Sequence, residues 1–238
     1  MGIRGQVAWV TGASRGIGRA TALALARAGA RVALSSRDAA ALAAVEGSVT
    51  ALGGEALVAV ADVSLPREVR AAAAAAEARF GGIDILINNA GVGWFRPFVD
   101  TAEDELVATL DVNLKGAILC ARAVLPGMIE RRRGQIVHVA SDLARRPLAG
   151  MAVYAAAKHG LLGFSASLLR EVKQHGVKVT AVLPGWTDTG FGGAREGSHD
   201  DRETLTPEFV AGEIVRLLEL PLDWVIDELA IHPLGQTF

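Results

Sequence analysis

Short apolar segments alternate with helix-favouring segments along almost the whole chain, and no other feature limits its possible folds as strongly. Few polar residues interrupt the apolar runs, and such runs are typical of strands buried on both faces of a parallel sheet. Strand–helix–strand connections are right-handed, so the repetition predicts an α/β chain with a doubly wound parallel sheet. The expected strands lie at 7–10, 31–35, 56–60, 83–87, 135–140, 177–182 and 224–231, and the expected helices at 17–28, 39–52, 67–80, 102–132, 152–175 and 207–220.

Length and the absence of a linker favour one domain over residues 1–238. A chain of 238 residues can bury a complete core without splitting, and no shift in composition interrupts it. The stretch 190–206 lacks periodicity and is rich in glycine and charge, so we expect a mobile substrate loop there.

Composition argues against several classes of function. The formal net charge of −2 gives no electrostatic reason to bind nucleic acid, and no apolar run approaches the ~20 residues needed to span a membrane. Cys120 is the single cysteine, which excludes an intrachain disulfide. Because the N-terminus shows no targeting pattern, we expect a soluble protein of the cytoplasm.

The first expected strand ends in a glycine-rich turn, Thr11-Gly-Ala-Ser-Arg-Gly-Ile-Gly18, which leads into a helix. Glycines permit a tight turn and let backbone amides approach a pyrophosphate at the helix N-terminus. Alone, the turn is equally compatible with an ordinary loop. Its place after the first strand of an α/β chain favours dinucleotide binding.

The only tyrosine of the chain, Tyr154, stands four positions before Lys158 in a helix-favouring segment. Side chains at i and i+4 share a helix face, so the phenol and the ammonium are expected to be neighbours. A cation ~4 Å away contributes ~4 kcal/mol at an effective dielectric of ~20, which would lower the phenol pKa toward neutrality. Such a phenol can exchange protons at physiological pH. The spacing by itself is most often a surface feature, so the context decides.

Further motifs follow in a fixed order. Asp62-Val63 comes after the third strand, Asn88-Asn-Ala-Gly91 after the fourth, Asn113 in the next helix, Ser141 thirteen residues before Tyr154, and Pro184-Gly185 with Thr189 after the sixth strand. Together with the Thr-Gly-x-x-x-Gly-x-Gly turn, they resemble the short-chain dehydrogenase/reductase family along nearly the whole chain. The resemblance implies a Rossmann-type sheet with strand order 3-2-1-4-5-6-7.

The resemblance also implies a catalytic set of Asn113, Ser141, Tyr154 and Lys158. Tyr154 would donate a proton to a carbonyl oxygen, or take one from an alcohol, as hydride moves to or from nicotinamide C4. Lys158 would lower the tyrosine pKa and hydrogen-bond the nicotinamide ribose. Ser141 would orient the carbonyl and stabilise the developing oxyanion, and Asn113 would hold a water that links Lys158 to solvent. The alternative roles are a strand-end hydroxyl for Ser141 and a packing residue for Asn113.

Residues at the ends of five strands are expected to bind the cofactor. An NAD-preferring site usually has an acid at the end of the second strand, whereas Ser36 and Arg37 stand here and the first acid is Asp38. Arg37 and Arg15 offer positive charge for a 2′-phosphate, which favours NADP(H), unless both are solvated surface residues. The expected set is Gly12, Ser14, Arg15, Gly16, Ile17, Gly18, Ser36, Arg37, Asp62, Val63, Asn89, Ala90, Gly91, Tyr154, Lys158, Pro184, Gly185, Thr187 and Thr189.

Apolar and aromatic residues near these motif ends suggest a substrate site that tolerates apolar groups. Core packing explains each of them equally well. Asp142, directly after Ser141, either contacts a polar or amino group or points outward, and Arg145-Arg146 either attracts an acidic substrate or forms an exposed turn. The expected substrate-binding residues are Trp94, Ser141, Leu143, Trp186 and Phe191, with Phe95 and Met151 as further candidates.

These patterns predict an NADP(H)-dependent oxidoreductase, without a metal, that reduces a ketone or aldehyde or oxidises the corresponding alcohol. The alternatives are an NAD-dependent sugar or steroid alcohol dehydrogenase and, in a different class, a catalytically silent dinucleotide-sensing scaffold. Residues 227–238 lack the glycine-and-aspartate-rich turn of many family members, which argues against an acyl-carrier-protein ketoreductase. The helices 102–132 and 152–175 carry more apolar surface than one face of the sheet can cover, so we expect a homodimer or homotetramer. Its partner in the reaction is expected to be a small-molecule carbonyl or alcohol substrate.

Overall fold

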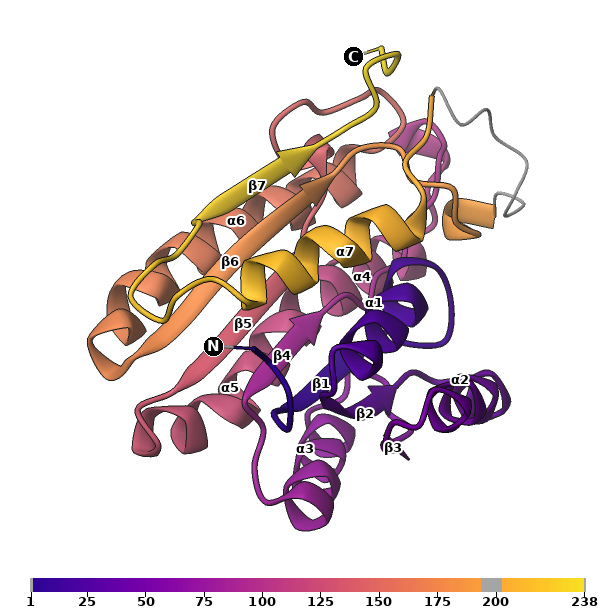
Figure 1. The fold of residues 1–238 in the computed structure, drawn as a ribbon. Helices are drawn as coiled ribbons and strands as arrows, with labels where there is room; N and C mark the ends of the chain where they lie inside the picture. Colours follow the sequence, from indigo (N-terminus) through magenta and orange to yellow (C-terminus); the bar gives the residue numbers. More distant parts are fainter. Residues whose placement is uncertain (1, 194–202, 238) are drawn as a thin grey trace.

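A computed structural model of the chain describes residues 2–193 and 203–237. Seven parallel strands form one sheet in the order β3-β2-β1-β4-β5-β6-β7 (Figure 1), so the predicted fold and strand order are confirmed. Of the expected loop 190–206, residues 194–202 lie outside the described part. The strands are β1 (Val7–Thr11), β2 (Arg31–Ser35), β3 (Ala56–Val58), β4 (Ile85–Asn88), β5 (Gly134–Val139), β6 (Val177–Pro184) and β7 (Glu228–Ile231).

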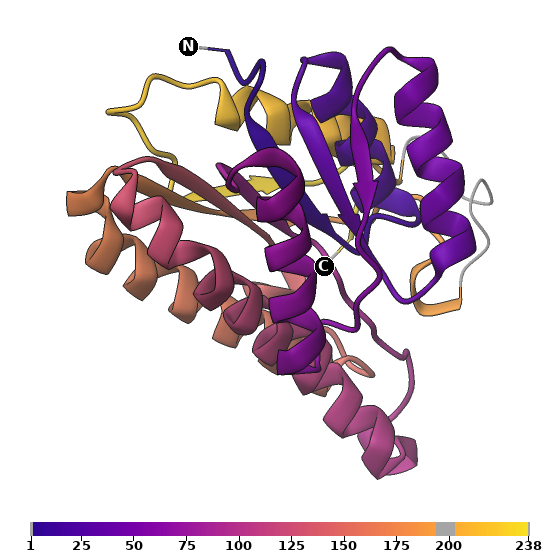
Figure 2. The ribbon, with the colours of Figure 1, turned by 90° about the horizontal axis from the view of Figure 1, so that it is seen from below.

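Helices cover both faces of the sheet, and Figure 2 shows the two helical layers on either side of it. On one face lie α1 (Gly16–Arg27), α2 (Ala39–Ala51) and α7 (Pro207–Leu218). On the other face lie α3 (Pro66–Phe80), α5 (Gly116–Glu130) and α6 (Ala152–Val172). Successive strand residues point to opposite faces, so Val10 and Leu34 pack in the first layer while Trp9 and Ala33 pack in the second. Strands apolar on both faces are therefore what this architecture requires.

The expected helix 102–132 is divided into three parts. α4 (Glu103–Leu110) continues through a π-helical turn, Asp111–Lys115, into α5. π-helical turns inside α-helices often mark functional positions, and this one contains Asn113. Short 3₁₀ turns lie at Phe98–Asp100, Asp142–Ala144, Lys173–His175 and Phe191–Gly193.

The last strand begins at Glu228, so the expected start at residue 224 is wrong. Within the described residues, β7 pairs with Ala181–Pro184 of β6. The residues before it form a turn in which the Trp224 N–H donates to the Pro221 carbonyl, and Trp224 is 65% exposed. The apolar run that begins at Trp224 resembles a strand in sequence, but its first residues lie outside the sheet.

One long helical stretch of the described residues, Glu103–Glu130, is apolar enough to cross a membrane by length and composition alone. Its inner side includes Cys120, Ala121 and Val124, which pack in the core with α3. We assign this stretch as a core helix.

Candidate active site

A cavity of about 890 Å³ opens at the carboxyl ends of the strands, where open α/β sheets bind their ligands. It is lined by all the predicted cofactor residues except Gly18, and by all the predicted substrate residues except Trp94. Asn113 lies behind its wall. Lining residues that the sequence patterns did not single out are Asp38, Ala41, Ala61, Val92, Val112, Val139, Ala140, Leu148, Gly192 and Gly193.

Trp94 lies away from this cavity. It lines a separate space of about 20 Å³ on the far side of Tyr154, whereas its neighbour Phe95 lines the main cavity. Adjacent side chains leave the backbone in different directions, so proximity in sequence did not determine which of the two aromatic residues faces the site. The position of Trp94 does not support a contact with substrate.

The glycine-rich turn is held by the segment that follows β4. The Thr11 hydroxyl accepts hydrogen bonds from the Asn89 and Ala90 N–H groups at 3.1 and 3.2 Å, and Asn89 Nδ2 donates to the Thr11 and Gly12 carbonyls. Gly12 has φ of 64°, and a Cβ there would lie 2.8 Å from Ala90 Cα. A Cβ at Gly18 would overlap the Gly12 carbonyl oxygen. Both positions therefore require glycine. Gly18 does not line the cavity, and its role is to let α1 pack closely against the turn.

The turn leads into α1 with its first N–H groups free of a side-chain cap from any described residue. Uncapped amides at a helix N-terminus form a site for an anion, and Arg15 adds positive charge beside them. Dinucleotide pyrophosphate fits this donor set.

The end of β2 is arranged as the NADP(H) prediction requires. Arg37 is 70% exposed along its side chain and lies 3.9 Å from Asp62, so its guanidinium extends over the cavity edge with a weak ion pair. The Asp38 carboxylate is engaged in capping α2, where it accepts from the Ala41 N–H at 3.0 Å. Asp62 in turn accepts from the Ser64 N–H and hydroxyl at 2.8 and 2.7 Å.

Ser141, Tyr154 and Lys158 meet in the wall of the cavity. Lys158 is buried, its Nζ donates to the Val139 carbonyl at 2.9 Å, and it lies 5.5 Å from the centre of the Tyr154 ring. The Ser141 hydroxyl receives the Leu143 N–H at 3.2 Å and donates to Asp142 Oδ1 at 3.3 Å. The Tyr154 ring also packs on Phe191, with ring centres 5.3 Å apart.

The pKa of Tyr154 differs from the expectation. Burial raises it above 10.0, the nearby Asp142 charge raises it further, and only a hydrogen bond with Ser141 acts in the opposite direction. Lys158 is itself buried, which lowers its pKa from 10.5 to about 7. The prediction that Lys158 brings the phenol pKa toward neutrality is therefore wrong for the protein without ligands, because burial removes the phenol from water and disfavours its charged form.

Asn113 is positioned by the π-helical turn. Its Nδ2 donates to the Val92 and Thr109 carbonyls at 2.7 and 2.8 Å, which fixes the orientation of the amide. Its Oδ1 is buried and accepts no hydrogen bond from any described residue. A Cβ built on Gly91 would lie 2.8 Å from this oxygen and 3.8 Å from Lys158 Nζ, so the two groups are near each other. Buried acceptors of this kind are usually satisfied by ordered water, which fits the predicted role.

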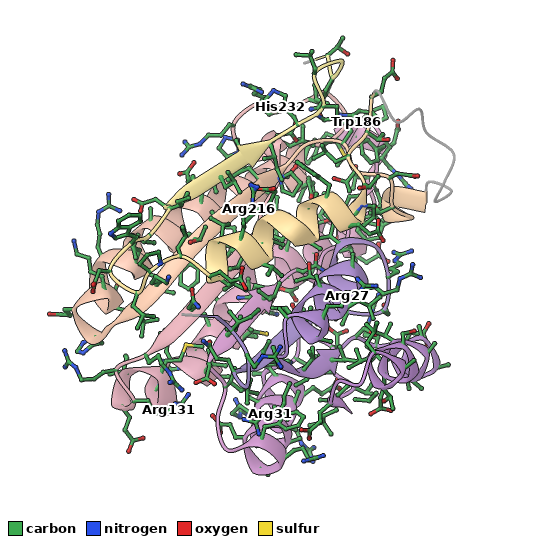
Figure 3. All side chains as sticks on the ribbon, in the orientation of Figure 1. Arg27, Arg31, Arg131, Trp186, Arg216 and His232 are labelled. Atoms are coloured by element: carbon green, nitrogen blue, oxygen red, sulfur yellow. The ribbon has the colours of Figure 1, made fainter. Side chains whose placement is uncertain are left out.

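Asp142 and Gln236 form a connection that no sequence pattern indicated. The Gln236 amide donates to Asp142 Oδ2, and its Oε1 accepts from the Trp186 N–H at 2.9 Å. The C-terminal segment thereby joins the residue after Ser141 to the segment after β6. Figure 3 shows that Trp186 and His232 both lie at this end of the molecule, where β6 and β7 end. Asp142 and Gln236 are 94 residues apart, a separation that local spacing does not reveal.

Arg145 does not line the cavity. Its guanidinium pairs with Glu228 through Nη2–Oε1 and Nε–Oε2 contacts of 2.5 and 3.2 Å. This pair instead fastens the segment after Ser141 to β7.

Comparison with known proteins agrees with this arrangement. A family model described as short chain dehydrogenase matches residues 6–199. A glycine betaine reductase of Emericella nidulans is 36% identical over 239 residues, which cover 97% of this chain but only 19% of that protein's length. A 3-oxoacyl-(acyl-carrier-protein) reductase of Vibrio cholerae is 37% identical over 209 residues, covering 87% of this chain and 82% of that protein.

Solved structures are similar over nearly their full length. An alcohol dehydrogenase of Thermococcus sibiricus complexed with 5-hydroxy-NADP has a TM-score of 0.93 and 30% identity, with 98% of each chain covered. A metagenomic short-chain oxidoreductase in complex with NADP has a TM-score of 0.84 and 39% identity, with 97% of this chain and 98% of that chain covered.

Proposed function

The chain belongs to the short-chain dehydrogenase family, and from this premise we propose that it is an NADP(H)-dependent oxidoreductase. It reduces the carbonyl of a ketone or aldehyde, or oxidises the corresponding alcohol. The observation that carries the proposal is the meeting of Ser141, Tyr154 and Lys158 in the wall of one cavity that also contains the glycine-rich turn.

Tyr154 is the proton donor of this reaction. The phenol holds its proton at neutral pH and gives it to the carbonyl oxygen, which becomes strongly basic as hydride reaches the carbonyl carbon. The Ser141 hydroxyl donates a second hydrogen bond to that oxygen and stabilises the charge that develops there. Lys158, when protonated, favours the tyrosinate left behind, and Asn113 holds the water through which the proton is replaced.

The cofactor is NADP(H), which supplies or accepts the hydride when bound. The amides at the start of α1 hold its pyrophosphate, and Arg15, Ser36 and Arg37 hold a 2′-phosphate. Asp38, the acid nearest the end of β2, is occupied in capping α2, which supports this preference over NAD(H). The solved relatives that contain NADP or 5-hydroxy-NADP support the same choice.

A 3-oxoacyl thioester is a second candidate substrate. The C-terminal sequence argued against it, but a relative that is 37% identical over most of both chains is a 3-oxoacyl-(acyl-carrier-protein) reductase. A sugar or steroid alcohol with NAD(H) lacks support at the end of β2. A silent dinucleotide-sensing scaffold would not need the intact Ser141, Tyr154 and Lys158.

The proposal is tested by measuring the loss of NADPH absorbance as the protein is offered ketones, ketoesters, quinones and 3-oxoacyl thioesters as substrates. We expect turnover with at least one class and a preference for NADPH over NADH of about tenfold or more. Turnover with none of them, while NADPH binds, would favour the scaffold. Equal affinities for NADPH and NADH would contradict the cofactor assignment.

A further inference from the structure

The carboxylate of Asp142 lies in the cavity wall directly beside the catalytic serine. Asp142 is 5% exposed, and Oδ1 accepts from the Ser141 hydroxyl at 3.3 Å while Oδ2 accepts from Gln236 Nε2. A carboxylate oxygen can accept more than one hydrogen bond, so both oxygens retain capacity for a further donor. The two partners fix the carboxylate in place.

No ion pair joins Asp142 to another residue that the structure describes. Arg145 pairs with Glu228 instead, Lys158 Nζ donates to the Val139 carbonyl, and neither makes an ion pair with Asp142. A buried carboxylate is costly unless a positive charge accompanies it. Its position in a substrate cavity suggests that the positive charge arrives with the ligand.

Three aromatic residues, Phe95, Trp186 and Phe191, line the same cavity as Asp142. The backbone N–H of Trp186 is connected to Asp142 through Gln236, and the Phe191 ring packs on Tyr154. Phe95 adjoins Phe191, since a Cβ built on Gly192 would lie 2.8 Å from the Phe95 ring. Aromatic faces attract ammonium groups, and they do so more strongly where water is displaced.

We propose that Asp142, Phe95, Trp186 and Phe191 form a subsite for a positively charged amino or quaternary ammonium group of the carbonyl substrate. This inference rests on the proposed carbonyl reduction and names the class of substrate. Asp142 adjoins Ser141, so the cation would lie close to the carbonyl, about one or two bonds along the substrate. A neutral group of the same shape fills the aromatic space but leaves the carboxylate without its counter-charge.

Two ketones of the same shape test this directly in the wild-type enzyme with NADPH. Acetonyl-trimethylammonium and methyl neopentyl ketone differ only in whether the branched atom is a charged nitrogen or a carbon. We expect kcat/KM to be about tenfold or more higher for the cation, and lowest for the anionic levulinate. Asp142→Asn keeps the size and an acceptor for Gln236 but lacks the charge, so the preference for the cation should disappear. Asp100→Asn, at an exposed position outside the cavity, is the control and should retain it.

The possible results separate this inference from the reaction itself. If both ketones are reduced at the same rate, the cation subsite is wrong and the carbonyl reduction stands. If the preference survives in Asp142→Asn, the carboxylate does not cause it and the assignment is wrong. If no ketone is reduced, the proposed reaction fails and the subsite fails with it. Equal rates for the two ketones in the wild type would contradict the subsite even where the variant does not fold. Retained NADPH binding shows that the variant has folded, and loss of the preference in it separates the carboxylate from the electron-withdrawing effect of the ammonium on the carbonyl.

Discussion

Replacement of Lys158 by methionine should stabilise the protein, and by an amount that depends on pH. Lys158 is 3% exposed, its Nζ has one hydrogen bond, to the Val139 carbonyl, and it makes no ion pair among the described residues. Burial disfavours the ammonium and lowers its pKa from 10.5 to about 7. The folded protein therefore bears a cost for holding this charge, which methionine, similar in length and uncharged, does not have.

The sign follows from where each state loses the proton. The unfolded chain keeps it up to pH 10.5, whereas the folded protein releases it above about pH 7. Between these values the unfolded state binds more protons, so stability rises with pH, and the full cost is present below pH 7. At 1.36 kcal/mol per pKa unit, the cost is about 5 kcal/mol at pH 6 and about 1.5 kcal/mol at pH 9.5.

Urea unfolding followed by tryptophan fluorescence measures this difference. The stability gained by Lys158→Met relative to wild type should be about 3 kcal/mol larger at pH 6 than at pH 9.5. His138, whose pKa is lowered to about 3 by burial and by Lys158, stays neutral in the folded protein across this range, and its titration near 6.5 in the unfolded chain is common to wild type and variant. Lys115→Met, at a half-exposed lysine 2.7 Å from Asp111, gives the baseline for losing a lysine. An equal difference at both pH values would refute the argument that Lys158 is a buried, uncompensated charge.

Two further substitutions test the cofactor and substrate ends of the cavity. Arg37→Leu should weaken NADPH binding about tenfold and leave NADH binding unchanged, because only NADPH presents a 2′-phosphate to this exposed guanidinium. Arg79→Leu, at another exposed arginine, is the control. Fluorescence titration measures the affinity of each variant for NADPH and for NADH. If Arg37→Leu changes both affinities equally, the 2′-phosphate assignment is wrong. Gly93→Ala should raise KM for the carbonyl more than the Kd of NADPH, because its Cβ would lie 2.9 Å from Phe191 and 3.1 Å from Tyr154. Unchanged steady-state kinetics in that variant would show that the two rings yield without cost.

The sheet and most of the site were predictable because they depend on local order along the chain. Buried strands require continuous apolar runs, and the ends of parallel strands meet at one edge of the sheet, so motifs that follow β1, β4, β5 and β6 had to converge. The exposed run at Trp224 imitated a strand, since polarity alone does not reveal whether a partner strand is present.

What the sequence left undetermined depends on contacts between distant segments and on depth of burial. The bridge from Gln236 to Asp142 and Trp186 forms only when the C-terminal segment returns to the end of β6. The spacing of Tyr154 and Lys158 predicted their proximity, but their pKa values depend on how completely both are removed from water. The choice between Trp94 and Phe95 depended on side-chain direction, which spacing does not specify.

Replacement of Tyr154 by phenylalanine separates proton transfer from cofactor binding, because it removes one hydroxyl and keeps the ring that packs on Phe191. We predict that turnover of any carbonyl substrate falls by about a thousandfold or more, while the Kd of NADPH stays within about twofold of wild type. Loss of both turnover and NADPH binding would show that the ring supports the cavity. A variant that binds NADPH and reduces the carbonyl at the wild-type rate would contradict the assignment of Tyr154 as the proton donor.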